Sequence, residues 1–138
     1  MSSFFSSEID AGLRLGLGGA ALGNLFSVVT DAQAQALLEA AWASGCRSFD
    51  TAPHYGHGRS ERRVGDALRV RAADSYVLSS KVGRLFTPNP QAPSAQHGYV
   101  DVLPFTQHRD YIASGSRRSI EDSLLRPGRA QLDVVYVH

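Results

Sequence analysis

One stretch of the chain carries its clearest structural pattern: Gly45-Cys46-Arg47-Ser48-Phe49-Asp50-Thr51-Ala52-Pro53-His54-Tyr55-Gly56. Residues 46–51 are short and bounded by glycine and proline, so we predict a strand there. The glycines and the proline within residues 52–59 predict a loop. A helix should follow, with Ser60 as its N-cap and Glu61 in its first turn. The side chains expected on its buried face are Val64, Ala67 and Leu68.

Strand and helix also alternate on the N-terminal side of this stretch. Residues 13–20 alternate apolar and small residues, which predicts a strand. Thr30-Asp31-Ala32-Gln33 has the pattern of a capping box, so a helix should begin after Thr30. Gly45 is expected just beyond the end of that helix. Its predicted apolar stripe consists of Leu37, Leu38, Ala41 and Trp42.

The C-terminal side continues the alternation after an interruption. Residues 76–82 are rich in strand-forming side chains and predict a strand. Residues 83–107 contain several prolines and predict a long loop, which is usually functional in a compact domain. A helix is expected over residues 116–126, and its apolar side should be Ile120, Leu124 and Leu125. Residues 132–137 are almost continuously apolar and predict a last strand, followed by His138.

Helices that connect successive strands indicate a parallel sheet covered by helices, because parallel neighbours need long connections. The 138 residues fit one ordinary domain with its own core. They are too few for a complete (β/α)8 barrel, which takes roughly 250 residues. We therefore expect an α/β fold with four strands.

Composition excludes several classes of partner. The formal net charge is only +1, whereas proteins that bind nucleic acid or acidic membranes as their main partner are usually basic. Residues 1–8 are neither basic nor continuously apolar, so we predict no signal peptide. No apolar run approaches the roughly 18 residues of a membrane span. The single Cys46 suits a reducing compartment, and we expect a cytoplasmic protein.

Four side chains that could take part in catalysis lie where predicted strands end: Asp50, Tyr55, Lys81 and His138. The carboxyl ends of parallel strands share one edge of the sheet, so these groups should converge. Taken singly, each has a commoner role, such as a turn Asp, a packed Tyr or a solvent-exposed Lys.

Together, the four side chains suit the reduction of a carbonyl. A Tyr hydroxyl has an ordinary pKa of about 10 and is a poor acid at neutral pH. A neighbouring ammonium lowers that pKa, a carboxylate keeps the ammonium charged, and a His can orient a substrate oxygen. Carbonyl reduction needs such a proton donor beside the carbon that receives hydride.

Three motifs in this order resemble aldo-keto reductases. The segment from Gly45 to Gly56, followed by a Glu and a Gly on the predicted helix, is similar to the family's [FI]-D-T-A-x-x-Y-G region. Ser79-Ser80-Lys81-Val82 resembles its [ST]-K motif, and residues 119–138 resemble its S-x-x-x-S-L…D-x-x-x-x-H motif. The resemblance implies a (β/α)8 TIM-barrel type of fold. Residues 1–138 would be one domain, the N-terminal half of that barrel with its first four strands, and the C-terminal half would be missing.

The resemblance also implies roles for individual residues. Asp50, Tyr55, Lys81 and His138 match the family's catalytic tetrad, in which Tyr55 is the proton donor. The cofactor would be NADP or NAD, the substrate a small carbonyl or sugar, and no residue is expected to hold a metal. The residues expected beside the nicotinamide are Gly19, Ala20, Ala21 and Asp50.

Within the family, the sequence is most similar to the branch of aldose and pyridoxal dehydrogenases. The glycine-rich first strand and the long proline-rich segment after Lys81 carry this similarity. On this reading a substrate pocket could be lined by Phe26, His54 and Phe86. Which carbonyl is the substrate, and whether NAD or NADP is used, stay open.

Two alternatives are weighed against this reading. Gly16-x-Gly18-x-x-Ala21 satisfies the Rossmann G-x-G-x-x-[GA] pattern. A true Rossmann fingerprint opens a helix at once and has an acidic residue about 20 positions on, whereas the first helix is predicted here only after Thr30. The other alternative is a non-catalytic half-barrel, either a truncated pseudoenzyme or a module completed by another chain. Four strands would leave an apolar edge at Val134, Val135 and Val137, through which copies of the chain could self-associate.

Overall fold

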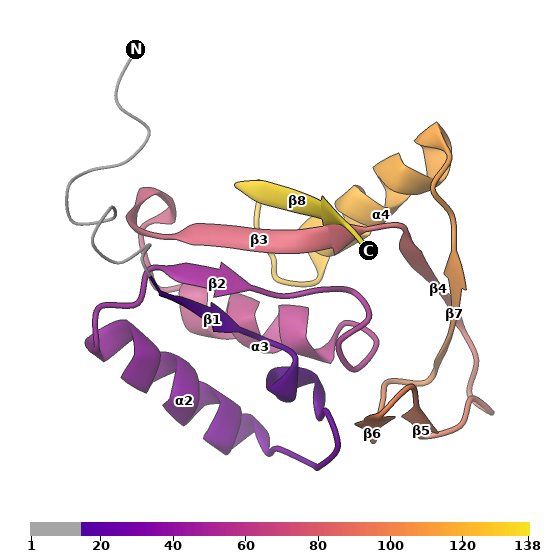
Figure 1. Cartoon of the computed structure of the whole chain (residues 1–138), viewed down its shortest axis with the longest axis horizontal. Coiled ribbons are helices and arrows are strands. Elements are labelled where there is room, and N and C mark those ends of the chain that lie inside the picture. The colour runs from indigo at the N-terminus through magenta and orange to yellow at the C-terminus, as the bar shows by residue number, and fades with distance from the viewer. Residues whose placement is uncertain (1–14) are drawn as a thin grey trace.

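Four parallel strands form the central sheet of the structure, a computed structural model that describes residues 15–138. In spatial order they are β1 (Gly16–Gly18), β2 (Ser48–Asp50), β3 (Val77–Val82) and β8 (Val134–Val137). The register pairs Asp50 with both Gly18 and Ser79, and Val82 with Val137. All four carboxyl ends therefore lie at the same edge of the sheet (Figure 1).

Two predictions fall on residues that the structure does not describe. The predicted lack of a signal peptide in residues 1–8 lies outside the described residues, as do the first two residues of the strand predicted over 13–20. The remainder of that strand is observed as β1, which ends at Gly18 and is followed by a 3-10 turn, η1 (Ala21–Gly23).

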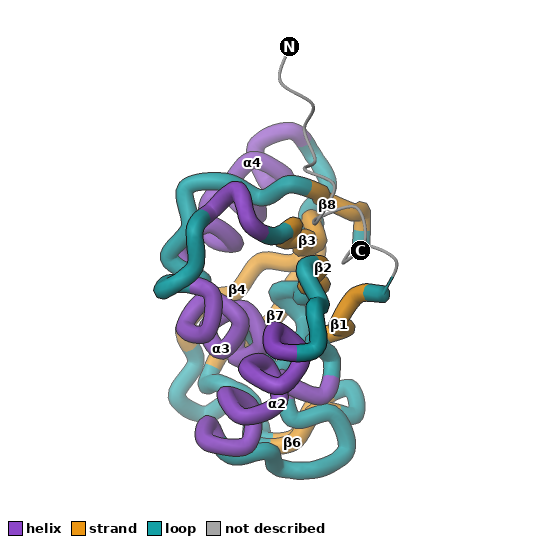
Figure 2. The backbone as a smooth tube through the Cα atoms, turned by 90° about the vertical axis from the view of Figure 1, so that its left-hand side faces the viewer, coloured by secondary structure: helices purple, strands orange, loops and turns teal. Residues whose placement is uncertain are grey.

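Three helices cover one face of the sheet. They are α2 (Asp31–Ala43), α3 (Arg59–Leu68) and α4 (Ala113–Leu125). Figure 2 shows all three on the same side of the strands, and within residues 15–138 no helix covers the opposite face. A second 3-10 turn, η2 (Ala73–Ser75), precedes β3. Among the described residues, 15–138, no helix is long and apolar enough to cross a membrane.

Helix α2 begins as its sequence predicts. The Thr30 hydroxyl accepts a hydrogen bond from the Gln33 backbone N–H, and the Gln33 side chain accepts from the Thr30 backbone N–H. Gly45 follows the helix with a φ of +91°, a conformation that favours glycine. Leu38 is buried, but Leu37 is 46% exposed, so the buried stripe is narrower than predicted.

The N-cap of helix α3 is Gly58 rather than Ser60, so the predicted N-cap is wrong. Ser60 instead lies inside the helix and is buried. Its hydroxyl donates to the Gly19 carbonyl over 2.8 Å and accepts from the Thr51 hydroxyl over 2.8 Å. These two long-range hydrogen bonds use the Ser60 oxygen to join α3 to the ends of β1 and β2, which a local pattern does not reveal.

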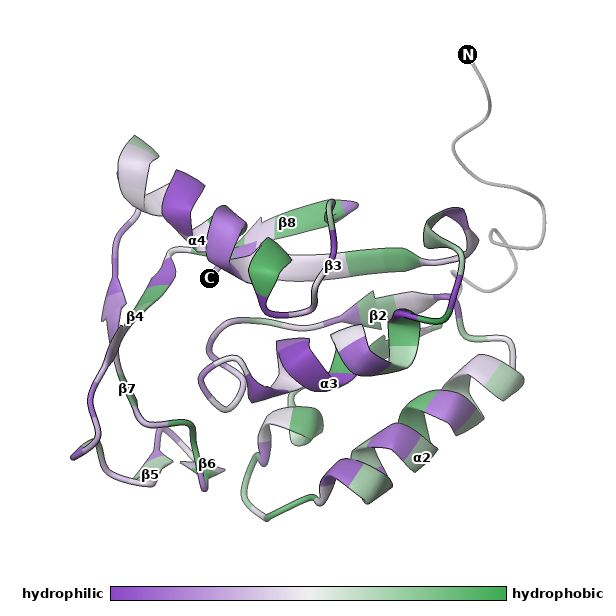
Figure 3. Ribbon diagram, turned by 180° about the vertical axis from the view of Figure 1, so that it is seen from behind, coloured by the Kyte–Doolittle hydropathy of each residue, from purple (hydrophilic) through white to green (hydrophobic). Residues whose placement is uncertain are grey.

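The core lies between the sheet and helices α2 and α3. Its buried side chains come from both layers: Leu22, Ala34, Leu38, Phe49, Val64, Ala67, Leu68, Tyr76 and Leu78. Trp42 stacks on Phe49 at 6.3 Å between ring centroids. Figure 3 shows that β3 is hydrophobic at its start and polar toward its carboxyl end. The core therefore sits under the first half of the sheet and leaves the carboxyl edge polar.

The segment predicted as a loop over residues 83–107 is largely ordered into strands. Strands β4 (Arg84–Pro88) and β7 (Phe105–Arg109) form an antiparallel pair. A smaller pair consists of β5 (Ala95–Gln96) and β6 (Tyr99–Val100). The prolines that suggested a loop mark the ends of these short strands, where a missing N–H is tolerated. The segment lies beyond the carboxyl ends of the sheet (Figure 1).

Helix α4 begins at Ala113, three residues before the predicted start, and buries a different face. Leu125, predicted as core, is 78% exposed, whereas Gly115, Ser119 and Ser123 are buried. Ser119 explains the difference, because its hydroxyl accepts from the Gly83 N–H over 3.2 Å and donates to the Arg84 carbonyl over 3.2 Å. Small residues let the helix approach the turn after β3.

The last strand, β8, is an edge of the sheet within the described residues, as predicted. It pairs only with β3, and Val137 is 80% exposed. Strand β1 forms the opposite edge. Both outer strands thus present unpaired backbone groups in residues 15–138.

Candidate active site

The ammonium of Lys81 lies at the centre of the candidate site. Its Nζ donates to Asp50 Oδ2 over 2.7 Å and to the Thr51 carbonyl over 3.0 Å. Both partners belong to the neighbouring strand end, because the register places Asp50 opposite Ser79, two residues before Lys81. The predicted ion pair between strands β2 and β3 is therefore present.

Ser79 holds the other oxygen of the Asp50 carboxylate. The Ser79 hydroxyl donates to Asp50 Oδ1 over 2.7 Å. Ser79 and Lys81 are two residues apart on β3, so both point to the same face of the sheet. The sequence prediction did not give Ser79 a role, although this spacing could have identified it. With both oxygens engaged, the carboxylate has a fixed orientation toward Lys81.

Tyr55 comes from the loop between β2 and α3 and lies over Lys81. The Lys81 Nζ is 4.9 Å from the centroid of the Tyr55 ring. The loop is closed by hydrogen bonds from the Tyr55 N–H to the Ala52 carbonyl and from the Ser60 N–H to the Tyr55 carbonyl. It also packs tightly on η1, since a Cβ on Gly23 would overlap the Tyr55 backbone. The position of Tyr55 is thus set by backbone contacts.

The pKa of Lys81 is raised by its partners. Burial alone would lower the pKa, but the hydrogen bonds and negative charge supplied by Asp50 and Tyr55 outweigh burial. The side chain therefore stays positively charged across the physiological pH range, directly beside the Tyr55 ring.

His138 completes the group of four predicted residues. Its backbone N–H donates to the Val82 carbonyl over 3.1 Å, at the end of the β3–β8 pair. Its ring lies 6.0 Å from the Tyr55 ring, and Nδ1 is buried without a hydrogen-bond partner among the described residues. Burial, together with the nearby positive charges of Arg84 and Lys81, lowers the pKa of His138 to about 4. The imidazole is therefore neutral at neutral pH.

The four residues that the sequence singled out thus converge at one edge of the sheet. The sequence also matches the family model described as aldo/keto reductase over residues 14–138. The chain belongs to the aldo/keto reductase family.

Two curated relatives and a solved structure place the chain within this aldo/keto reductase family. It is 43% identical to D-threo-aldose 1-dehydrogenase of a Pseudomonas species, over 100% of this chain and 44% of the relative. It is 44% identical to pyridoxal 4-dehydrogenase of Microbacterium luteolum, over 90% of this chain and 39% of the relative. An aldo-keto reductase from Klebsiella pneumoniae in complex with NADPH superimposes with a TM-score of 0.57 at 28% identity, over 89% of this chain and 34% of that structure.

These similarities confirm the predicted family and barrel type of fold. The chain spans less than half the length of the curated relatives it matches. Residues 15–138 accordingly contain four strands of a parallel sheet.

The residues predicted to lie near a cofactor follow β1 at the same edge of the sheet. Gly19 is buried, and its N–H donates to the Asp50 carbonyl over 2.7 Å. The Gly19 carbonyl accepts from the Ser60 hydroxyl, so both backbone polar groups of Gly19 already have hydrogen-bond partners within the protein. Ala20 is half-buried and Ala21 is exposed. The Ala20 and Ala21 carbonyls accept from the Gly23 and Asn24 N–H groups, so the N–H groups of Ala20 and Ala21 are the part of this segment that can meet a ligand.

Residues of the strand segment after Lys81 also reach the site, which sequence reasoning missed. His54 Nδ1 is 2.7 Å from Gln107 Oε1, and the His54 ring lies 5.5 Å from both His97 and His138. Tyr99 stacks on Tyr55 at 6.0 Å. These contacts join residues far apart in the sequence. Because residues 83–107 were predicted as a loop, the positions of their side chains could not be predicted.

The three side chains predicted to line a substrate pocket have different surroundings. His54 lies beside His138, at the candidate site. Phe26 is 80% exposed and lies near Gly98. Phe86 packs against His57 and Phe105 instead. Among these three side chains, only that of His54 has a ring contact with one of the four candidate catalytic residues in the described part of the chain.

Proposed function

We propose that the whole protein is an NAD(P)-dependent oxidoreductase that interconverts aldehyde or sugar carbonyls and alcohols. Tyr55 is the general acid in reduction and the general base in oxidation. The observation that supports this most directly is the Lys81 ammonium, which is hydrogen-bonded to Asp50 at 2.7 Å and lies 4.9 Å from the Tyr55 ring.

The proton chemistry follows from these positions. A positive charge beside a phenol favours the phenolate, so Lys81 makes Tyr55 a better proton donor near neutral pH. Asp50 keeps the ammonium charged and in place. The neutral His138 ring can donate a hydrogen bond to a carbonyl oxygen and direct it toward the Tyr55 hydroxyl.

The segment after β1 fits a nicotinamide cofactor. Ala20 and Ala21 follow Gly19, whose N–H donates to the Asp50 carbonyl, and their own N–H groups make no backbone hydrogen bond within residues 15–138. A Cβ on Gly18 would meet no atom within 4 Å. We assign these residues and Gly19 to the nicotinamide side of the site. When bound, NADP or NAD supplies or accepts the hydride.

Polar side chains around the site favour a hydroxyl-bearing substrate. His54, His97 and Gln107 surround the approach to Tyr55 and His138 with hydrogen-bonding groups. The names of the two curated relatives, an aldose and a pyridoxal dehydrogenase, support the same class. We therefore propose small polar carbonyl compounds, sugars included, as substrates, in the reducing cytoplasm that the lone Cys46 suits.

We also propose that residues 1–138 form the N-terminal half of an eight-stranded barrel. Two features of residues 15–138 support this arrangement: β1 and β8 are unpaired edges of the sheet, and the helices lie on one face only. A non-catalytic half-barrel is the alternative, and the following experiment separates the two.

Replacing Tyr55 by Phe in the full-length protein should lower kcat by at least about 100-fold, because the proton donor is lost. The rate of NAD(P)H oxidation with a small aldose or aldehyde measures the effect. Tyr76→Phe is the matched control, since the Tyr76 hydroxyl is buried, has no hydrogen-bond partner within residues 15–138 and lies at the other end of β3. An unchanged rate of the chemical step in Tyr55→Phe would refute the proposal.

A further inference from the structure

A pocket lies on the outer surface of the molecule, along α3, where it extends from the start of α2 to the end of α4. Two adjoining hollows of about 570 and 330 Å³ share Arg62, Leu103 and Arg126 in their walls. None of the four residues proposed for catalysis lines either hollow. The pocket is therefore separate from the candidate active site.

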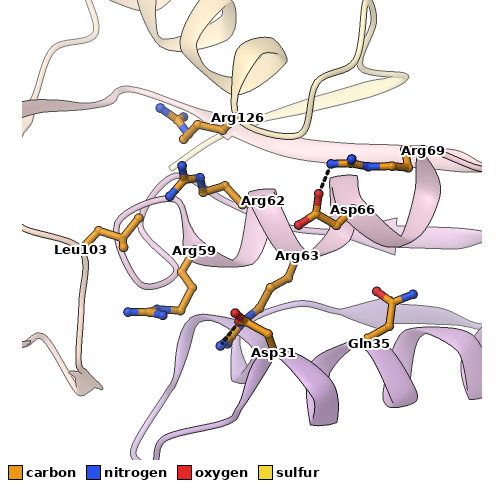
Figure 4. Close-up of a pocket in the computed structure, with 9 residues that line it drawn as sticks. All are labelled: Asp31, Gln35, Arg59, Arg62, Arg63, Asp66, Arg69, Leu103 and Arg126. Atoms are coloured by element: carbon orange, nitrogen blue, oxygen red, sulfur yellow. Dashed lines mark hydrogen bonds and ion pairs between the residues drawn. The ribbon is translucent and has the colours of Figure 1, made fainter.

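Arginine dominates the walls of this outer pocket. Figure 4 shows Arg63 paired with Asp31 and Arg69 paired with Asp66. The side chains of Arg59, Arg62 and Arg126 extend instead toward the end of the pocket where Leu103 lies. Arg62 makes no ion pair or side-chain hydrogen bond with any residue in the described range 15–138. Its guanidinium can thus offer all its N–H groups to a ligand.

Arg126 and Arg59 also keep donors for a ligand. Arg126 uses Nε for the buried carboxylate of Glu61 and Nη2 for Ser123. The aliphatic part of Arg126 packs on Gly58, where a Cβ would clash with it, and this contact fixes its direction. Arg59 donates through Nη2 to Asp101, while its buried Nε has no partner in the described part of the chain.

A buried histidine adds an acceptor to these donors. His57 is 2% exposed and lines the smaller hollow. Its Nδ1 lies 3.3 Å from the Leu103 carbonyl, which can only accept, so Nδ1 carries the proton in the neutral ring. Nε2 is then an acceptor, and it has no hydrogen-bond partner in residues 15–138. A ligand that carries a hydroxyl would satisfy it.

The rest of the smaller hollow is apolar. Leu103, Phe105 and Leu125 line it together with His57 and the two shared arginines. Arginine donors bind phosphate oxygens in a bidentate manner, and a phosphate monoester that retains one proton also supplies a P–OH donor for Nε2. The apolar wall suits the organic part of such an ester.

We propose that this pocket binds the phosphate group of a small phosphate monoester, separately from the active site. The phosphate oxygens accept hydrogen bonds from Arg59, Arg62 and Arg126. His57 Nε2 accepts a hydrogen bond from the phosphate hydroxyl, and the apolar wall contacts the organic group. His57, which lines this pocket, belongs to the loop that carries Tyr55 and follows it by two positions.

Titration calorimetry of the full-length protein with phenyl phosphate, in buffer of physiological salt concentration, tests this proposal. We expect saturable binding that is tighter than that of inorganic phosphate and is absent with phenol. Arg62→Gln should weaken binding about tenfold, because a charge-assisted hydrogen bond is lost. Arg117→Gln removes an exposed arginine of α4 outside the pocket and should leave affinity unchanged.

A second variant separates this site from the active site. Tyr55→Phe should retain phenyl phosphate binding, whatever it does to turnover. The proposal is overturned if the wild-type protein shows no saturable binding, if phenyl phosphate binds no better than inorganic phosphate, or if Arg62→Gln and Arg117→Gln weaken binding equally. Binding abolished by Tyr55→Phe would assign the ligand to the active site and overturn it as well.

Discussion

Lys81 joins three parts of the chain through one ammonium group. It contacts the Asp50 side chain, the Thr51 carbonyl and the face of Tyr55, and burial excludes most water from it. The sequence alone could identify Asp50, Tyr55 and Lys81 as candidate site residues, because each lies where a predicted strand ends. The hydrogen bond from Ser79 to Asp50 depends on strand register and emerged only from the structure.

Lys81→Met removes the positive charge beside the Tyr55 ring, so the Tyr55 phenolate should form less readily. In the oxidation direction, which needs the phenolate, the pH–rate profile should move to higher pH. Steady-state kinetics of the full-length variant from pH 6 to 10 measure this shift. Lys81→Arg keeps the charge and should move the profile less. An unmoved profile in Lys81→Met would contradict the assigned role.

The His138 imidazole should titrate near pH 4, well below an ordinary histidine. A proton binds more weakly to the folded than to the unfolded state, so this group lowers stability as pH falls from about 6.5 toward 4. Above pH 6.5 it has no effect on stability. NMR titration of the His138 ring proton that lies between the two nitrogens measures this pKa. A midpoint near 6.5 for His138 would show that the ring is not buried as described.

At the scale of elements, local patterns predicted helices better than their contacts. The capping box of α2 needs only Thr30 and Gln33, three positions apart in one turn, and it is present as predicted. Ser60 and Leu125 were assigned wrongly because their environments come from distant parts of the chain. The antiparallel pair of β4 and β7 was missed because its strands are separated in sequence, and local patterns do not show which distant segments pair.

Gly65 of α3 gives a test at this scale. Alanine normally favours a helix interior over glycine by about 1 kcal/mol. Here a Cβ would overlap the backbone of Pro127, which follows α4, so overpacking should dominate and cost about 1–3 kcal/mol. Thermal unfolding should show a lower Tm for Gly65→Ala. Arg62→Ala, on the exposed side of the same helix, is the control, and an equal or higher Tm for Gly65→Ala would contradict the close approach.

At the scale of the whole molecule, the open sheet edges govern the expected behaviour. Strand β8 presents Val135 and Val137 to solvent, and no helix covers one face of the sheet in residues 15–138. The four proposed catalytic residues are all present on this chain, but the chain spans only 44% and 39% of the two curated relatives. An experiment on residues 1–138 alone can therefore test whether the proposed catalytic residues suffice for activity without a complete barrel.

Residues 1–138 produced alone should give no appreciable NAD(P)H turnover and should self-associate through β8. Analytical ultracentrifugation should show larger species at higher concentration, and Val137→Lys should reduce them by placing a charge on the exposed edge. Thr87→Lys, an exposed change on β4, is the control. Turnover that Tyr55→Phe abolishes, or a monomeric wild-type fragment, would contradict this expectation.

The amino-acid sequence by itself determined the alternation of strands and helices, the family and the identities of the four candidate catalytic residues. These depend on local periodicity and on motifs whose members lie near one another in the chain. Only the tertiary structure decided which groups orient Asp50, where His54 and Tyr99 lie, and that arginines of α3 and α4 meet His57 in an outer pocket. The physical reason is that these contacts depend on strand register and helix packing, which bring together residues widely separated in sequence.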